Sequence, residues 1–181
     1  MRLRIKPADV ASVKDRQLFF DANVLLYLFG SVGTPSNQWA INTYSAIFGN
    51  CLKMQNVLCV DVLVLSEFIN RCLRIEYENH LKTNKLDRNQ FNFKDFRSTN
   101  EGIQVAQDVE SVVKGRILKD FKLVGKLFNE ADITAISLVN SDFNDELIVK
   151  TCKEHQCVLV TNDADFSGVD IDILTANNKI I

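Results

Sequence analysis

The sequence predicts an α/β fold, in which a central, mostly parallel sheet is flanked by helices on both faces. Short apolar segments at 17–21, 57–65, 157–161 and 170–175 have the length and composition of buried strands. Longer segments lie between them, and their apolar residues recur at steps of three or four, as on one face of a helix. Strands that alternate with helices pair in parallel and are covered on both faces.

Composition supports one ordered domain spanning residues 1–181. The chain is 46% hydrophobic and has only 7 glycines and 2 prolines. No apolar run approaches the roughly 20 residues of a membrane span, and no apolar stretch behind the N-terminus resembles a secretory signal. The five cysteines are odd in number and form no Cys-x-x-Cys pair. We therefore expect reduced, buried thiols in a cytoplasmic protein rather than a zinc site.

The elements can be placed in order along the chain. The first strand, 17–21, runs into a short helix, and the second strand, 57–65, runs into a helix that begins at Ser66. Residues 80–126 are expected to form a helical and loop insertion, because the composition turns polar from 80 to 101. The helices are expected at 23–29, 37–54, 66 onward, 103–126, 129–139 and 142–155.

Two predicted strands end in an acidic residue. Asp21 closes the first strand, and Asp163 follows the strand at 157–161. Each has a structural alternative, since Asp21 could be a helix N-cap and Asp163 an ordinary turn residue. Functional sites of parallel sheets lie beyond the carboxyl ends of the strands. If the two strands are neighbours, both acids meet there.

Two further acids begin helices. Glu67 lies just past the second strand, although a solvated helix position is an equal alternative. Asp145 starts the apolar face of its helix, and Asp142 is available as the cap. Asp132, one helix earlier, is a second candidate for the third acid. We prefer Asp145 because its distance to Thr161 fits one helix and a short turn.

Four converging carboxylates would repel one another strongly in a partly buried pocket. Mg²⁺ and Mn²⁺ bind carboxylate oxygens and would relieve that repulsion. One or two such ions can activate a water molecule and stabilise the leaving oxygen of a phosphodiester. The acids therefore indicate a metal-dependent hydrolase.

The phrases around these acids resemble the successive motifs of PIN domains, particularly the VapC-type toxin nucleases. They are Phe20-Asp-Ala-Asn23, Leu65-Ser-Glu-Phe68, Asp145-Glu-Leu-Ile148 and Leu159-Val-Thr-Asn-Asp-Ala-Asp-Phe166. The resemblance extends from about residue 17 to 174, and the chain is longer than the compact toxins, with the excess in 80–126. It implies a Rossmann-like, three-layer PIN fold and a Mg²⁺- or Mn²⁺-dependent endoribonuclease that hydrolyses RNA. An antitoxin protein and a homodimer are further partners that it leaves open.

The resemblance also implies the site residues. The metal-binding and catalytic acids would be Asp21, Glu67, Asp145 and Asp163. The residues that orient them or the bound water would be Asn23, Thr161 and Asp165.

Contacts to RNA have to come from local basic patches, because the formal net charge is −2. Arg71 and Arg74 lie one and two helical turns beyond Glu67. Lys119, Lys122 and Lys126 are expected to share a helical face that could track phosphates, although an ordinary solvated face is the simpler interpretation.

Two other functions fit parts of the pattern. A catalytically silent PIN-like module could bind RNA or a protein without cleaving anything. A haloacid-dehalogenase-type phosphatase also opens with an apolar strand and an Asp, but it needs a second acid where this chain has Asn23.

Overall fold

A single sheet of six strands forms the centre of the protein. The computed structural model describes residues 2–31, 35–137, 139 and 141–181. Every strand pair is parallel, and the strand order is β1-β6-β5-β2-β3-β4. The strands are β1 (Arg4–Ile5), β2 (Gln17–Phe20), β3 (Val57–Val60), β4 (Phe121–Leu123), β5 (Val158–Val160) and β6 (Ile173–Leu174). The predicted α/β fold with a flanked parallel sheet is confirmed.

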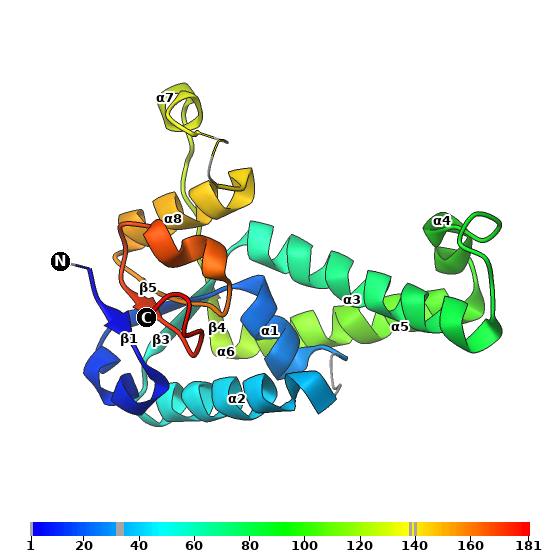
Figure 1. The fold of residues 1–181 in the computed structure, drawn as a ribbon, viewed down its shortest axis with the longest axis horizontal. Coiled ribbons are helices and arrows are strands. Elements are labelled where there is room, and N and C mark those ends of the chain that lie inside the picture. Colours follow the sequence, from blue (N-terminus) through cyan, green and yellow to red (C-terminus); the bar gives the residue numbers. More distant parts are fainter. Residues whose placement is uncertain (1, 32–34, 138, 140) are drawn as a thin grey trace.

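Helices cover this sheet on both sides, with α2 on one side and α8 on the other (Figure 1). The central strands β2, β3 and β5 are buried except at the first residues of β2 and β3, because their other residues are apolar on both faces. The α-helices are α1 (Ala22–Phe29), α2 (Gln38–Lys53), α3 (Val62–Asn84), α4 (Phe93–Arg97), α5 (Asn100–Val112), α6 (Leu118–Asp120), α7 (Glu130–Thr134) and α8 (Phe143–His155). Short 3-10 segments lie at Pro7–Val13, Pro35–Asn37 and Ala164–Gly168, and a π-helical turn at Val113–Ile117.

The predicted helix at 103–126 is wrong in its last part, which contains the edge strand β4. Phe121 is buried, and its ring packs 5.1 Å from Phe20 and 5.8 Å from Phe48, measured between centroids. This aromatic cluster favours an extended chain beside β3 over a further helical turn. Lys119 lies in α6 and Lys122 in β4, so the expected basic helical face does not exist.

The predicted strand at 57–65 is also too long, and its helix begins four residues earlier than Ser66. The cause is Asp61, whose carboxylate accepts a hydrogen bond from the Val64 amide at 2.8 Å and caps α3. The predicted helix at 129–139 is shorter as well. Its described part, α7, ends at Thr134, and residue 138 lies outside the described residues.

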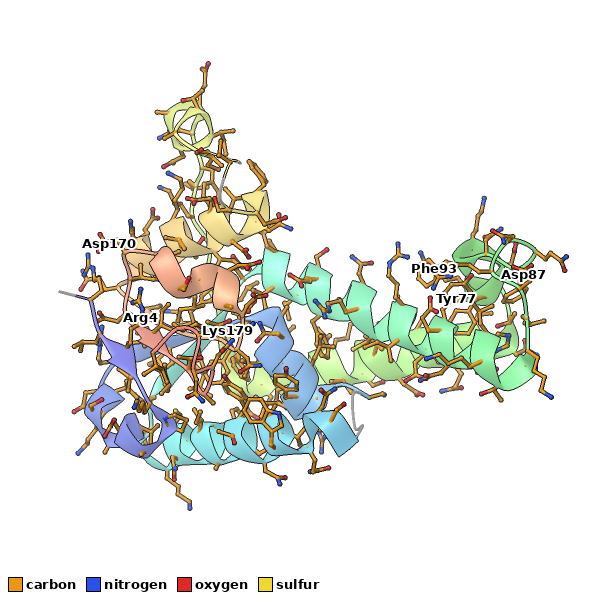
Figure 2. The ribbon with its side chains drawn as sticks, in the orientation of Figure 1. Arg4, Tyr77, Asp87, Phe93, Asp170 and Lys179 are labelled. Carbon is orange, nitrogen blue, oxygen red and sulfur yellow. The ribbon has the colours of Figure 1, made fainter. Side chains whose placement is uncertain are left out.

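The long helix α3 extends away from the sheet, α5 runs beside it, and α4 lies at the far end (Figure 1). We call residues 74–112 the arm. It has a small apolar core of its own around Tyr77, Leu81 and Phe96. Tyr77 and Phe93 lie together near its tip (Figure 2). Residues 113–120 lead back to β4, which itself lies within the expected insertion at 80–126. Only the first part of that insertion therefore leaves the sheet region.

Two expectations about the whole chain can be compared with this fold. All five cysteines are free thiols and buried. None of the helices in the described ranges combines the length and the hydrophobicity that a membrane span requires.

Candidate active site

The carboxyl ends of β2 and β5 lie side by side and bring the first acid to the site. These strands pair in parallel with Phe20 opposite Val160, and the Asp21 amide donates to the Val160 carbonyl at 3.1 Å. Asp21 and Thr161 are the next residues on each strand, and both are buried, Asp21 being 5% exposed. The parallel pairing therefore places a carboxylate and a hydroxyl next to each other in the interior.

Asp21 has two roles, one for each carboxylate oxygen. Its Oδ1 accepts from the Ala22 amide at 2.6 Å, which makes Asp21 the N-cap of α1. Its Oδ2 accepts from Asn23 Nδ2 at 2.6 Å and from Thr161 Oγ1 at 2.8 Å. The capping alternative is thus correct, but it uses only one of the two oxygens.

Asp163 and Asp165 belong to the turn that follows β5. The Asp163 amide donates to Thr161 Oγ1 at 3.0 Å, and the Asp163 carboxylate accepts from the Asp165 amide at 3.1 Å. Both acidic side chains are exposed. The turn alternative for Asp163 is therefore also correct. The same turn binds Asp163 to the hydroxyl that contacts Asp21.

Glu67 and Asp145 come from helices α3 and α8, and both are partly buried. Glu67 forms an ion pair with Arg71 at 3.3 Å, one turn along α3. Asp142 caps α8 by accepting from the Asn144 amide at 2.8 Å. Asp145, in the first turn, is therefore not needed as the cap.

The pKa values of Asp21 and Asp145 show that the four carboxylates lie close enough to affect one another electrostatically. The pKa of Asp21 is raised to about 7, chiefly by burial, with further contributions from the charges of Glu67 and Asp163. Its hydrogen bonds from Thr161 and Ala22 oppose this rise. The pKa of Asp145 is also raised to about 7, first by burial and then by Asp21, Asp142, Asp163 and Asp165. Each of the two thus lies within the field of several other carboxylates.

The surroundings of Asp132 are different. It completes a capping box with Asn129 and forms ion pairs with Lys126 at 3.2 Å and Lys150 at 4.0 Å. The backbone of Asn129 and these two lysines hold its pKa below the usual value. An acid that two cations already neutralise has little need of a metal ion, which favours Asp145 as the third site acid.

The donor set of the site suits a hard divalent cation. Its acidic side chains offer oxygen only, which Mg²⁺ and Mn²⁺ prefer. Of the four acids, Glu67 alone has an ion-pair partner among the described residues. Within those residues, no group of three or more His, Cys, Asp or Glu side chains is arranged closely enough to hold an ion. The acids are thus electrostatically coupled but do not form a closed coordination shell.

A comparison with protein families agrees with this parallel sheet and its flanking helices. The model of the PIN domain matches residues 18–172. The chain belongs to the PIN-domain family. PIN domains are generally nucleases, so the family indicates a nuclease-type fold and a nucleic-acid substrate, and it sets aside the dehalogenase-type phosphatase. Searches of curated proteins and of solved structures gave no significant match.

The basic residues expected to contact RNA differ in exposure, in pairing and in the element that carries them. Arg71 and Arg74 are exposed on α3, and Arg74 lies over the Phe93 ring at 4.8 Å. Lys126 is held between Glu154 at 2.8 Å and Asp132, so its charge is already balanced. Lys119 and Lys122 are exposed, but on different elements.

Sequence reasoning did not single out Asn162 and Tyr44, which hold the turn after β5, or the buried helix cap Asp61. Asp61 ends β3 as Asp21 ends β2, and its position inside an apolar run could have drawn attention to it. Asn162 stands between Thr161 and Asp163. Tyr44, on α2, binds the turn with its hydroxyl group. Tyr44 carried no signal in the sequence, because an aromatic residue on an apolar helix face indicates core packing.

Proposed function

We propose that this PIN domain is a Mg²⁺- or Mn²⁺-dependent endoribonuclease. In this proposal Asp21, Glu67, Asp145 and Asp163 bind the metal and form the catalytic site. The observation that carries it is Asp21, a buried acid among other acids and without a cationic partner in the described structure. Burying such a charge is costly unless a cation or a proton compensates it.

The metal would activate the attacking water and stabilise charge on the phosphate. The residues of the chain hold the acids in place. Asn23 and Thr161 fix the orientation of the Asp21 carboxylate by donating to the same oxygen. Asp165 donates its amide to Asp163 and adds negative charge near Asp145. Asn23, Thr161 and Asp165 are thus orienting residues in the proposed site.

For the RNA strand, we propose a path along α3. Glu67, Arg71 and Arg74 are spaced four and three residues apart, so they share one helical face. At about 1.5 Å per residue, Arg74 lies roughly 10 Å along the axis from Glu67. The Phe93 ring holds the Arg74 side chain from one side. Lys119 and Lys122 are secondary candidates, and the paired Lys126 is the weakest.

A cleavage assay tests the proposal directly. Purified protein is incubated with mixed single-stranded and structured RNA, and in parallel with DNA, in Mg²⁺, Mn²⁺ or EDTA. We expect cleavage of RNA that EDTA abolishes and that Asp21→Asn lacks. Cleavage of DNA alone would contradict the RNA assignment. No cleavage with either metal would favour the silent binding module.

The toxin role is a narrower part of the proposal. An antitoxin could neutralise the site by placing a basic side chain among the carboxylates, in charge-assisted hydrogen bonds. Expression in a bacterial host tests this role, since a cytoplasmic toxin should arrest growth only while Asp21 is intact. Normal growth with an enzyme active in vitro would indicate a housekeeping nuclease. Sedimentation of the purified protein would show whether it forms the homodimer.

A further inference from the structure

Tyr44 has no exposed surface, yet its hydroxyl group contacts polar groups that follow β5 and β6. The Thr161 carbonyl lies 2.9 Å from this hydroxyl and Asn162 Oδ1 lies 3.0 Å from it. The hydroxyl also accepts from the Ala176 amide at 3.1 Å. A phenol has one proton, so the two oxygen acceptors share it. One buried side chain of α2 thus joins the segment after β5 to the segment after β6.

The residue between Thr161 and Asp163 is held at every polar group. The amide of Asn162 donates to Asn23 Oδ1 at 3.2 Å, and its carbonyl accepts from Asn177 Nδ2 at 2.7 Å. Its side-chain oxygen accepts from Tyr44, and its side-chain nitrogen donates to the Tyr27 hydroxyl at 3.3 Å. These partners come from α1, α2 and the C-terminal segment. Asn162 is therefore fixed from three directions.

The partners are themselves rigidly placed. The rings of Tyr27 and Tyr44 are stacked, with centroids 5.7 Å apart and an interplanar angle of 16°. The Asn177 amide donates to Thr175 Oγ1 at 3.0 Å, and Thr175 has no exposed surface. A polar network that is at least partly buried, and in which each member has partners, favours one geometry.

We infer that Tyr44 and the C-terminal segment 175–177 set the position of the 161–163 turn relative to Asp21. Tyr44 is a positioning residue, because it acts through Thr161 and Asn162 and not on the substrate. Thr161 contacts Asp21 with its hydroxyl and holds the Asp163 amide with the same atom. A shift of this turn would therefore change the spacing of two proposed metal ligands. The inference deepens the proposed function and rests on it for its catalytic consequence.

The chain offers a matched control in the arm. Tyr77 is also buried, and its hydroxyl donates to the Phe91 carbonyl at 2.7 Å. Tyr44→Phe and Tyr77→Phe each delete one buried phenol oxygen and keep the ring. If Tyr44 only stabilises the fold, both variants should lower the melting temperature and neither should affect the site. If it positions the turn, Tyr44→Phe alone should affect the site.

The experiment measures kcat for RNA cleavage, the affinity for Mn²⁺ and the melting temperature of both variants. We expect the melting temperature to fall in both variants, and further in Tyr44→Phe, which leaves more polar partners unpaired. For Tyr44→Phe we expect kcat to fall about 10- to 100-fold, because small displacements of reacting groups are costly, and Mn²⁺ to bind several-fold more weakly. Asn177→Ala, which removes a different contact to Asn162, should lower kcat in the same direction. Tyr77→Phe should keep kcat within about twofold of wild type.

Amide hydrogen exchange in residues 161–165 separates this inference from the proposed function. We expect Tyr44→Phe to speed exchange there at least about tenfold and Tyr77→Phe to leave it unchanged. If the wild-type protein cleaves nothing, the proposed function fails, while exchange and Mn²⁺ affinity still test the positioning role. If Tyr44→Phe and Asn177→Ala match Tyr77→Phe in exchange and Mn²⁺ affinity, the inference is overturned. Unchanged kcat in an active protein would overturn it too.

Discussion

Two strand ends of this protein carry the same local structure. Asp21 follows β2 and caps α1, and Asp61 follows the neighbouring strand β3 and caps α3. Both side chains are buried, at 5% and 3% exposure, and burial raises the pKa of both. Both are thus buried helix caps at strand ends, although Asp21 accepts from the first amide of its helix, Ala22, and Asp61 from the third, Val64.

They differ in what surrounds the rest of the carboxylate. The hydrogen bonds that affect the pKa of Asp61 come from the amides of Leu63 and Val64 in its own helix. Asp21 also receives the side chains of Asn23 and Thr161 and lies in the field of Glu67 and Asp163. A buried acid after a parallel strand is therefore not evidence of a site by itself. Asp21 is distinguished from Asp61 by additional hydrogen-bond donors and by neighbouring acids, both from other elements.

The largest expected effect separates these two aspartates by activity. We expect Asp21→Asn to reduce metal-dependent cleavage by about 10²- to 10³-fold, the range found when a group that stabilises transition-state charge is removed. Asp61→Asn, which removes an equally buried charge and can still cap, should stay within about twofold of wild type. Rates under single-turnover conditions with excess Mg²⁺ provide the measurement. Equal losses in both variants would show that the comparison is wrong.

A second pair of variants tests the third acid. Asp145→Asn should lower cleavage by about 100-fold, because Asp145 shares the field of Asp21 and Asp163. Asp132→Asn should leave the rate nearly unchanged, since its partners are Lys126 and Lys150. The same assay measures both. A loss in Asp132→Asn with full activity in Asp145→Asn would reverse the assignment.

The strand ends also show how far the sequence predicts this protein. The strands at 17–21 and 157–161 were predictable because each contains an apolar run, Leu18–Phe20 and Cys157–Val160, that is buried on both faces. Their acids were predictable because each follows such a run within three residues. β1 and β4 were not predicted, since edge strands of two and three residues leave too little pattern. Their pairing depends on neighbours that are distant in the sequence.

The site was predictable only in part, for a related reason. Asp61 was assigned to the middle of one long predicted strand at 57–65, because the first turn of α3 is as apolar as β3. The support from Tyr44 and Asn177 could not be predicted, because it depends on contacts across 117 and 15 residues. Motifs therefore predict which acids belong to a PIN site, whereas the atoms that hold them come from packing.

The pH dependence of stability should differ between wild type and Asp21→Asn. The folded-state pKa of Asp21, about 7, lies above the ordinary value of 3.8 for an aspartate, so the folded state holds this proton more tightly. Its contribution to stability is fully present below about pH 4 and is lost as pH rises toward 7. Each pKa unit corresponds to about 1.4 kcal/mol, so the loss between pH 5 and 7 is at most about 3 kcal/mol. Asp21→Asn does not lose stability in this way, because its side chain does not ionise.

Melting temperatures in EDTA at pH 5, 6, 7 and 8 test this expectation. Relative to that of wild type, the melting temperature of Asp21→Asn should rise by several degrees between pH 5 and pH 8, at about 2–4 °C per kcal/mol. Asp145, whose pKa is also raised to about 7, should reinforce the trend, because removing the charge of Asp21 relieves it as well. If the melting temperatures of the two proteins changed in parallel with pH, ionisation of Asp21 would not be what destabilises the folded state.

The smallest expected effect isolates capping at the second strand end. Asp61→Asn and Asp61→Ala both remove the buried charge, but only asparagine can still accept from the Val64 amide. The alanine variant should therefore be less stable than the asparagine variant by about 1 kcal/mol, or roughly 2–4 °C in melting temperature. Cleavage should be unchanged in both, because the cap stabilises α3 without contacting the proposed metal ligands. If Asp61→Ala lost activity while Asp61→Asn kept it, the start of α3 would have to position Glu67, five residues into the helix from its first residue Val62. Asp61 would then join Tyr44 as a residue that acts on the site through the backbone it holds.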